Sequence, residues 1–123
     1  MARLSAKAGR VNGELVFEAA RSGDPAAKKL FDNIGYWLGI GIASLVNIFE
    51  LEAVAVGGGL SETGGLLLDP ARDSYMQHAF APEHRGTPPI IASAHGADAG
   101  IIGAANLSLY GCPEFRATSV AAP

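Results

Sequence analysis

The segment LEAVAVGGGLSE, residues 51–62, carries an apolar run into three consecutive glycines and then into polar residues. The residues before the glycines, Glu52–Val56, predict a short buried strand. Three glycines in a row are entropically costly in any ordered element, so this position requires a backbone without side chains. A glycine-rich turn that leads from the carboxyl end of a parallel strand into a helix is a common place for a ligand.

Two helices are expected before this strand. Asn12 is expected to cap a short helix that runs to about Arg21, and Gly23 is expected to end it with a left-handed backbone. The pair Asp24–Pro25 predicts the start of a second helix, since aspartate caps free amides and proline suits the first helical position. This helix is expected to run through Phe49, with its apolar later part buried.

The chain after the glycines predicts two more helices and a strand. A third helix is expected from near Gly64 to Ala79, capped by Ser61 or Thr63, with a kink or restart at residues 69–70, Asp-Pro. A loop, a second short strand and a last helix are expected at residues 79–89, 90–94 and 98–110. The order α-α-β-α-β-α gives an α/β chain with a short parallel sheet and a right-handed crossover. Two strands are few for such a sheet, so the chain is expected to be part of a larger one.

The composition indicates one small globular domain. The chain has 123 residues, of which 49% are apolar and 17% charged, with a net charge of −3 and no basic block. Binding to nucleic acid through phosphate neutralisation is therefore not expected. The single cysteine, Cys112, forms no internal disulfide, which suits a reducing cytoplasm. Residues 1–10 are expected to be a disordered or truncated start, and residues 112–123 a flexible tail.

An uncharged segment, residues 34–49, invites a membrane interpretation. It falls short of the roughly 20 residues that cross a bilayer, so a buried helix is expected instead. Its aromatic pair, Tyr36 and Trp37, is expected to pack in the core rather than stack on a base. Close packing against another backbone is expected at the glycines within the helices, since glycine is costly there: Gly35, Gly39, Gly41, Gly100 and Gly103.

The residues alone leave two interpretations of the glycine turn, Gly57–Ser61. It contacts a nucleotide, because glycines let a ligand approach the backbone and a helix start favours phosphate. Alternatively, it is a tight turn where helix and strand backbones touch. The pattern matches neither GxGxxG nor GxxxxGK[ST], and it offers no lysine to a phosphate.

Three longer segments resemble the ROK family of bacterial sugar kinases and sugar-responsive repressors, and within it the glucokinases are most similar. They are GDPAAKKLFDNIGYWLGIGIASLVNIFELEAVAVGGGL at 23–60, SETGGLLLDPARDSY at 61–75 and HGADAGIIGAANL at 95–107. The resemblance implies a partial actin-like, ribonuclease-H-like ATPase domain, with residues 11–111 as the C-terminal half of the nucleotide-binding domain. It also implies that ATP with Mg²⁺ and a hexose, most simply glucose, are the ligands.

In that family the triple-glycine turn lies beside the adenosine and phosphates of ATP. This role maps onto Gly57, Gly58 and Gly59, with Leu60 and Ser61 flanking them. The family's Asp-x-Gly-x-Thr motif, its catalytic aspartate and its cysteine-rich zinc motif are absent from this sequence. No catalytic or metal-binding residue is therefore expected here, and the isolated chain is expected to be inactive and to self-associate as a homo-oligomer. The alternative is the C-terminal portion of a ROK repressor.

Other polar residues have structural explanations. The aspartates at positions 24, 69 and 98 lie at expected helix starts, where capping explains them better than catalysis. The histidines at 78, 84 and 95 lack the pattern of a metal-ligand set. His95 follows the second strand and could line the cleft, and Arg72 is expected on a solvated face.

Overall fold

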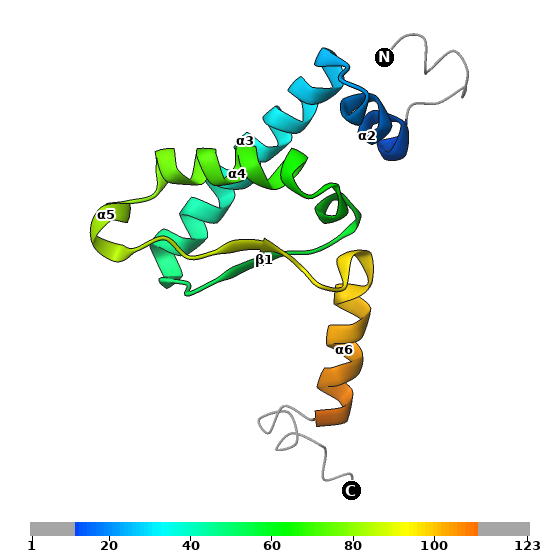
Figure 1. Ribbon diagram of the computed structural model, residues 1–123. Coiled ribbons are helices and arrows are strands. Elements are labelled where there is room, and N and C mark those ends of the chain that lie inside the picture. The colour runs from blue at the N-terminus through cyan, green and yellow to red at the C-terminus, as the bar shows by residue number, and fades with distance from the viewer. Residues whose placement is uncertain (1–11, 111–123) are drawn as a thin grey trace, which may run out of the picture.

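A computed structural model describes residues 12–110, in which helices pack on one side of a two-stranded parallel sheet (Figure 1). Short 3₁₀ helices are labelled η. The elements in chain order are α2 (Gly13–Arg21), α3 (Pro25–Phe49), β1 (Val54–Val56), η1 (Gly59–Thr63), α4 (Gly65–His78), α5 (Pro82–Arg85), β2 (Ile90–Ala92), η2 (Gly96–Asp98) and α6 (Ala99–Tyr110). The short helices η1, α5 and η2 were not expected from the sequence. The expected start at residues 1–10 and the tail at 112–123 lie outside the described residues.

The sheet is parallel, as the sequence predicted. In its register Val54 lies opposite Ile90 and Val56 opposite Ala92. Both strands are shorter than expected, and the chain returns from one to the other through α4. The carboxyl ends of β1 and β2 therefore lie at the same edge of the sheet.

The starts of the first two helices confirm the capping predictions. The Asn12 side chain accepts a hydrogen bond from the backbone N–H of Leu15 at 2.9 Å. The Asp24 carboxylate accepts two at 2.9 and 3.0 Å from the first turn of α3, which begins with proline. Gly23 has φ +93° and reverses the chain between the helices. The aspartate and glycine signals thus fixed both boundaries correctly.

The α3 and α4 helices cross in close contact, and glycines permit this approach. A Cβ added at Gly35 would lie 2.6 Å from the ring of Pro70, and one at Gly39 would lie 2.4 Å from the carbonyl oxygen of Ala71. Two adjoining clusters of buried side chains form the core. The close packing that was expected at other helical glycines is not found, because nothing lies within 4 Å of a Cβ built on Gly41, Gly100 or Gly103.

The start of α4 differs from the prediction. The hydroxyl groups of Ser61 and Thr63 donate to the carbonyls of Gly58 and Leu60 within η1, so neither side chain caps α4. Gly64, at φ +59°, precedes the helix without a side-chain cap. The glycine turn therefore closes on itself before the long helix begins.

The expected restart at Asp69–Pro70 is not found, because α4 is one helix from residue 65 to residue 78. Pro70 packs on Gly35 of α3, and this contact favours the proline in a helix interior. Asp69 is a helix-interior residue rather than a cap. Its carboxylate accepts a hydrogen bond from Nη1 of Arg72 at 2.9 Å.

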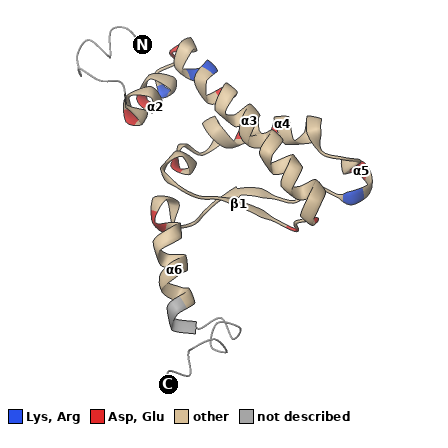
Figure 2. Cartoon of the chain, turned by 180° about the vertical axis from the view of Figure 1, so that it is seen from behind, with Lys and Arg blue, Asp and Glu red and all other residues tan. Residues whose placement is uncertain are grey.

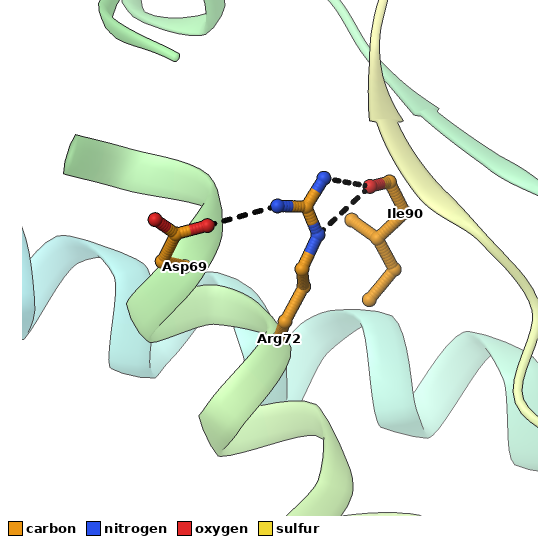
Figure 3. A network of polar contacts seen from close by, with 3 residues as sticks. All are labelled: Asp69, Arg72 and Ile90. Carbon is orange, nitrogen blue, oxygen red and sulfur yellow. Dashed lines mark hydrogen bonds and ion pairs between the residues drawn. The ribbon is translucent and has the colours of Figure 1, made fainter. Parts of the chain in front are cut away.

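Arg72 connects α4 to the sheet, as Figure 3 shows. Its Nε and Nη2 groups both donate to the carbonyl oxygen of Ile90, at 3.1 and 2.6 Å. Arg72 is exposed, as expected, but its guanidinium also joins a helix to the first residue of β2, which was not expected. Sequence spacing gave no signal for a contact between residues 18 positions apart.

The outer face of α3 is exposed, contrary to the prediction that this part of the helix is buried. The side chains of Trp37 and Ile48 are 64% and 69% exposed. Tyr36 and Trp37 contact one another edge to face with ring centroids 5.6 Å apart, outside the core. The covered residues of α3 face α2, α4 and the sheet. Across the described residues, no helix has the length and apolar character needed to span a membrane.

Candidate functional site

Two turns meet where β1 and β2 end. Val56 of β1 accepts a hydrogen bond from the backbone N–H of Ser93 at 2.8 Å, just beyond β2. The N–H of Gly58 donates to the carbonyl oxygen of Gly96 at 3.0 Å. The parallel register thus brings the glycine turn against the turn that contains η2.

The three glycines of this turn differ in their surroundings. Gly58 has φ +94°, a backbone conformation that residues other than glycine rarely adopt. A Cβ on Gly57 would meet Ala99 and Ser93 at ordinary contact distances of 3.5 and 3.7 Å, and one on Gly59 would meet nothing within 4 Å. No neighbouring protein atom therefore excludes a Cβ at any of the three positions. This observation disfavours a tight helix–strand contact as the reason for the triple glycine and leaves the backbone open to a ligand.

The flanking residues Leu60 and Ser61 have opposite environments. Leu60 is 51% exposed, whereas Ser61 is 2% exposed. The hydroxyl and N–H groups of Ser61 both donate to the carbonyl oxygen of Gly58, at 2.7 and 2.9 Å. The serine thus holds the turn in shape, and the leucine offers an apolar surface beside it.

A cleft of about 500 Å³ lies between the two turns. Its lining residues come from η1 and the start of α4, from the end of β2 and from η2 and α6: Ser61, Glu62, Gly64, Ala92, Ser93, Ala94, His95, Gly96, Asp98 and Ile102. His95 lies in this lining, in the position expected for it after the second strand. The sequence analysis did not identify Ser93 or Glu62 as site residues. Each follows the carboxyl end of a strand, and that position was the signal that could have indicated them.

The charged residues in the lining of this cleft are acidic. Glu62 and Asp98 contribute carboxylates, and no lysine or arginine belongs to the lining. Figure 2 shows the same pattern, with acidic positions on the turns that precede α4 and α6. Of the predicted nucleotide-contacting residues only Ser61 belongs to the lining, and Gly57, Gly58, Gly59 and Leu60 do not. The backbone amides and the exposed Leu60 of the adjoining glycine turn are therefore the groups here that suit an anionic ligand with an apolar base.

The other candidate residues lie apart from this cleft. Nδ1 of His78 lies 2.7 Å from the carbonyl oxygen of Ser74, and His84 lies beside Glu83 on the short helix α5. Among the described residues, no three histidine, cysteine, aspartate or glutamate side chains gather as a metal site. Cys112 lies outside the described residues. Asp24 caps α3, as described above, and Asp98 lies in η2.

A second cleft, of about 510 Å³, lies at the opposite end of the sheet, between α3 and the segment 85–89. The carboxylate of Glu50 and the guanidinium of Arg85 form an ion pair there. The Asn47 side chain accepts a hydrogen bond from the N–H of Phe80 at 3.0 Å. These polar groups thus already serve to hold the chain after α4 against α3.

Comparison with known proteins identifies relatives for nearly the whole chain. The model of the ROK family matches residues 1–110. A glucokinase of Streptomyces coelicolor is 39% identical over 98 residues, which cover 80% of this chain and 31% of that protein. A xylose repressor of Caldicellulosiruptor bescii is 34% identical over 65 residues, covering 53% of this chain and 16% of the repressor.

A solved structure supports the same relationship. The ROK family glucokinase of Streptomyces griseus, in complex with glucose and AMPPNP, superposes with a TM-score of 0.77 at 40% identity. The match covers 82% of this chain and 32% of that protein. The chain thus spans about a third of the length of the glucokinases it matches.

Proposed function

The chain belongs to the ROK family, and on this premise we propose that it supplies the nucleotide-binding part of a cytoplasmic, ATP-dependent sugar kinase. In this proposal the turn Gly57–Gly59 contacts the adenosine and phosphates of ATP. Leu60 offers an apolar surface to the nucleotide, and Ser61 flanks the turn and fixes its shape.

The observation that carries the proposal is the open backbone of the triple glycine. Gly58 requires its positive φ, while a side chain at Gly59 would meet no protein atom. A position that needs no glycine for packing, and lies at the carboxyl end of a parallel strand, is best explained by a ligand that approaches the backbone. The similarity to a glucokinase that was solved with AMPPNP supports a nucleotide as that ligand.

The proposed reaction is transfer of the γ-phosphoryl group from ATP to a hydroxyl group of a hexose, for which the glucokinase relatives favour glucose. Mg²⁺ bound to the triphosphate would neutralise charge in the transition state. The described residues do not form a metal site of three side chains, so we assign the ion no ligand in this chain. The contribution of this chain is to bind and orient the nucleotide, and the catalytic base belongs to the length of the kinase that this chain does not span.

Substitution of Gly58 tests the proposal. In the protein as its source cell makes it, Gly58→Val should weaken AMPPNP binding by at least about tenfold, because a branched side chain at positive φ distorts the turn and blocks approach. Glucose affinity should be unchanged. Gly86→Val is the matched control, since Gly86 also has a positive φ, of +74°, but lies at the opposite end of β2. Unchanged AMPPNP affinity in Gly58→Val would refute the site.

The alternative is a sugar-responsive repressor of the same family, which the match to a xylose repressor favours. That match covers about half of the chain, less than the glucokinase match does. The two functions are separated by assaying the native protein for glucose-dependent ATP turnover and for binding to promoter DNA of its own operon. DNA binding without ATP turnover would favour the repressor.

A further inference from the structure

The two turns around the cleft are joined by a side chain as well as by the backbone. Oε1 of Glu62, in η1, accepts a hydrogen bond from the N–H of Ala97, in η2, at 3.3 Å. Two backbone hydrogen bonds also link these turns, from Gly58 to Gly96 and from Ser93 to Val56. The Glu62 bond adds a third link, farther along η1 than the two backbone bonds, and so further restricts the movement of η2 relative to η1.

The shape of Gly96 matches this carboxylate. A Cβ on Gly96 would lie 2.5 Å from Oε1 of Glu62 and 3.1 Å from its Cγ. The Glu62 side chain thus lies directly against the Cα of Gly96, and any larger residue would displace it from the Ala97 amide. Gly96 also has φ +46°, a backbone conformation that favours glycine, and the N–H of the next residue, Ala97, donates to the carboxylate.

Both members of this pair lie in the lining of the cleft. A shift of η2 relative to η1 would change the width of this cleft, which adjoins the glycine turn through Ser61 and Glu62. We infer that Glu62 is a positioning residue for the nucleotide: its carboxylate holds η2 against the glycine turn and so sets the geometry of the cleft. We name this group of three residues the clamp: Glu62, Gly96 and Ala97. That the ligand is a nucleotide rests on the proposed function. The clamp itself rests on the hydrogen bond between Glu62 and Ala97 and on the contact between the Glu62 side chain and Gly96.

Three variants of the native protein separate positioning from direct contact. Glu62→Ala removes the acceptor and should weaken AMPPNP binding about three- to tenfold, with the KM for glucose unchanged. Glu62→Gln keeps a carbonyl oxygen in the same place and should restore binding to nearly the unaltered value. Glu52→Ala, at the other end of β1, removes an exposed carboxylate of the same type and should have no effect. Equal damage from Glu62→Gln and Glu62→Ala would overturn the inference, because the charge rather than the acceptor would then matter.

A second substitution approaches the clamp from the opposite turn. Gly96→Ala places a methyl group against the carboxylate and should weaken AMPPNP binding on its own. In the double variant Glu62→Ala/Gly96→Ala, the methyl group no longer meets that carboxylate, so the loss should be smaller than the product of the single losses. Strictly multiplicative losses would mean that the two residues act independently, and the inference would fail.

Hydrogen exchange at one amide tests the clamp without any nucleotide. The Ala97 amide should exchange faster in Glu62→Ala than in the unaltered protein or in Glu62→Gln, while the helices keep their circular dichroism. An unchanged rate at Ala97 would overturn the clamp. If instead the unaltered protein binds no AMPPNP while Glu62→Ala accelerates exchange, the proposed function fails and the clamp stands. If Glu62→Ala does not fold, Gly96→Ala gives the same exchange test.

Discussion

The Cα of Gly39 lies against the carbonyl of Ala71, where α3 and α4 are in close contact. Two residues further along α3, Gly41 faces open space and is exposed. The same residue type therefore has opposite energetic roles in one helix. At Gly39 it permits close packing, whereas at Gly41 it adds only backbone entropy to the unfolded state.

This contrast gives a matched pair of substitutions. Gly39→Ala should lower the free energy of unfolding by about 1–3 kcal/mol, because the new methyl group meets backbone that cannot easily move. Gly41→Ala should raise it by up to about 1 kcal/mol, since alanine favours the helix and meets nothing. Urea unfolding monitored by circular dichroism measures both. Equal effects of the two changes would contradict the packing described for Gly39.

The glycines also show what the sequence could and could not predict about single residues. The cost of glycine in a helix correctly indicated close contacts at Gly35 and Gly39. The same argument failed at Gly41, because a sequence does not tell which face of an apolar helix is covered. For Gly57–Gly59, the sequence left a ligand and a tight turn as alternatives. Distances around each Cα were needed to separate them, and the ligand-contacting role itself remains a prediction.

Helix boundaries were predictable where a side chain acts on its own helix. Asn12 and Asp24 cap α2 and α3 as expected, because their hydrogen bonds reach only two or three residues along the chain. The same reasoning misplaced Asp69 and Pro70, which sit inside α4. Contact of Pro70 with Gly35 and of Asp69 with Arg72 overrides the local signal there. Such contacts between separate segments cannot be inferred from a local pattern.

The hydrogen bonds of Arg72 to Ile90 predict how much this side chain stabilises the packing of α4 on the sheet. Arg72→Ala removes both hydrogen bonds to the Ile90 carbonyl and should lower the free energy of unfolding by about 1–2 kcal/mol. Arg72→Lys should recover part of the loss, because one donor can still reach a single acceptor. Lys29→Ala on the exposed side of α3 is the control and should be nearly neutral. Thermal unfolding checks the series, and a neutral Arg72→Ala would contradict the role assigned to this guanidinium.

The molecule as a whole exposes apolar surface on two sides. The outer face of α3 exposes Trp37, Ile48 and Phe49, and α6 extends away from the sheet with Ile101 exposed (Figure 1). Exposed apolar area of this kind is uncommon on monomeric proteins. The glucokinase relatives are more than twice as long, so their additional length offers one cover for these faces. A second copy of the chain offers another.

When the 123-residue chain is studied alone, only a second copy of the chain can cover these apolar faces. We therefore expect its mass by light scattering to rise with concentration above the monomer mass of 12.6 kDa. Ile48→Lys, which places a charge on the outer face of α3, should shift this equilibrium toward the monomer. Gln77→Lys adds the same charge to an exposed polar position of α4 and should leave the association unchanged. A chain that stays monomeric at high concentration would show that these apolar faces do not drive self-association, and a response to Gln77→Lys as large as that to Ile48→Lys would assign the effect to net charge rather than to α3.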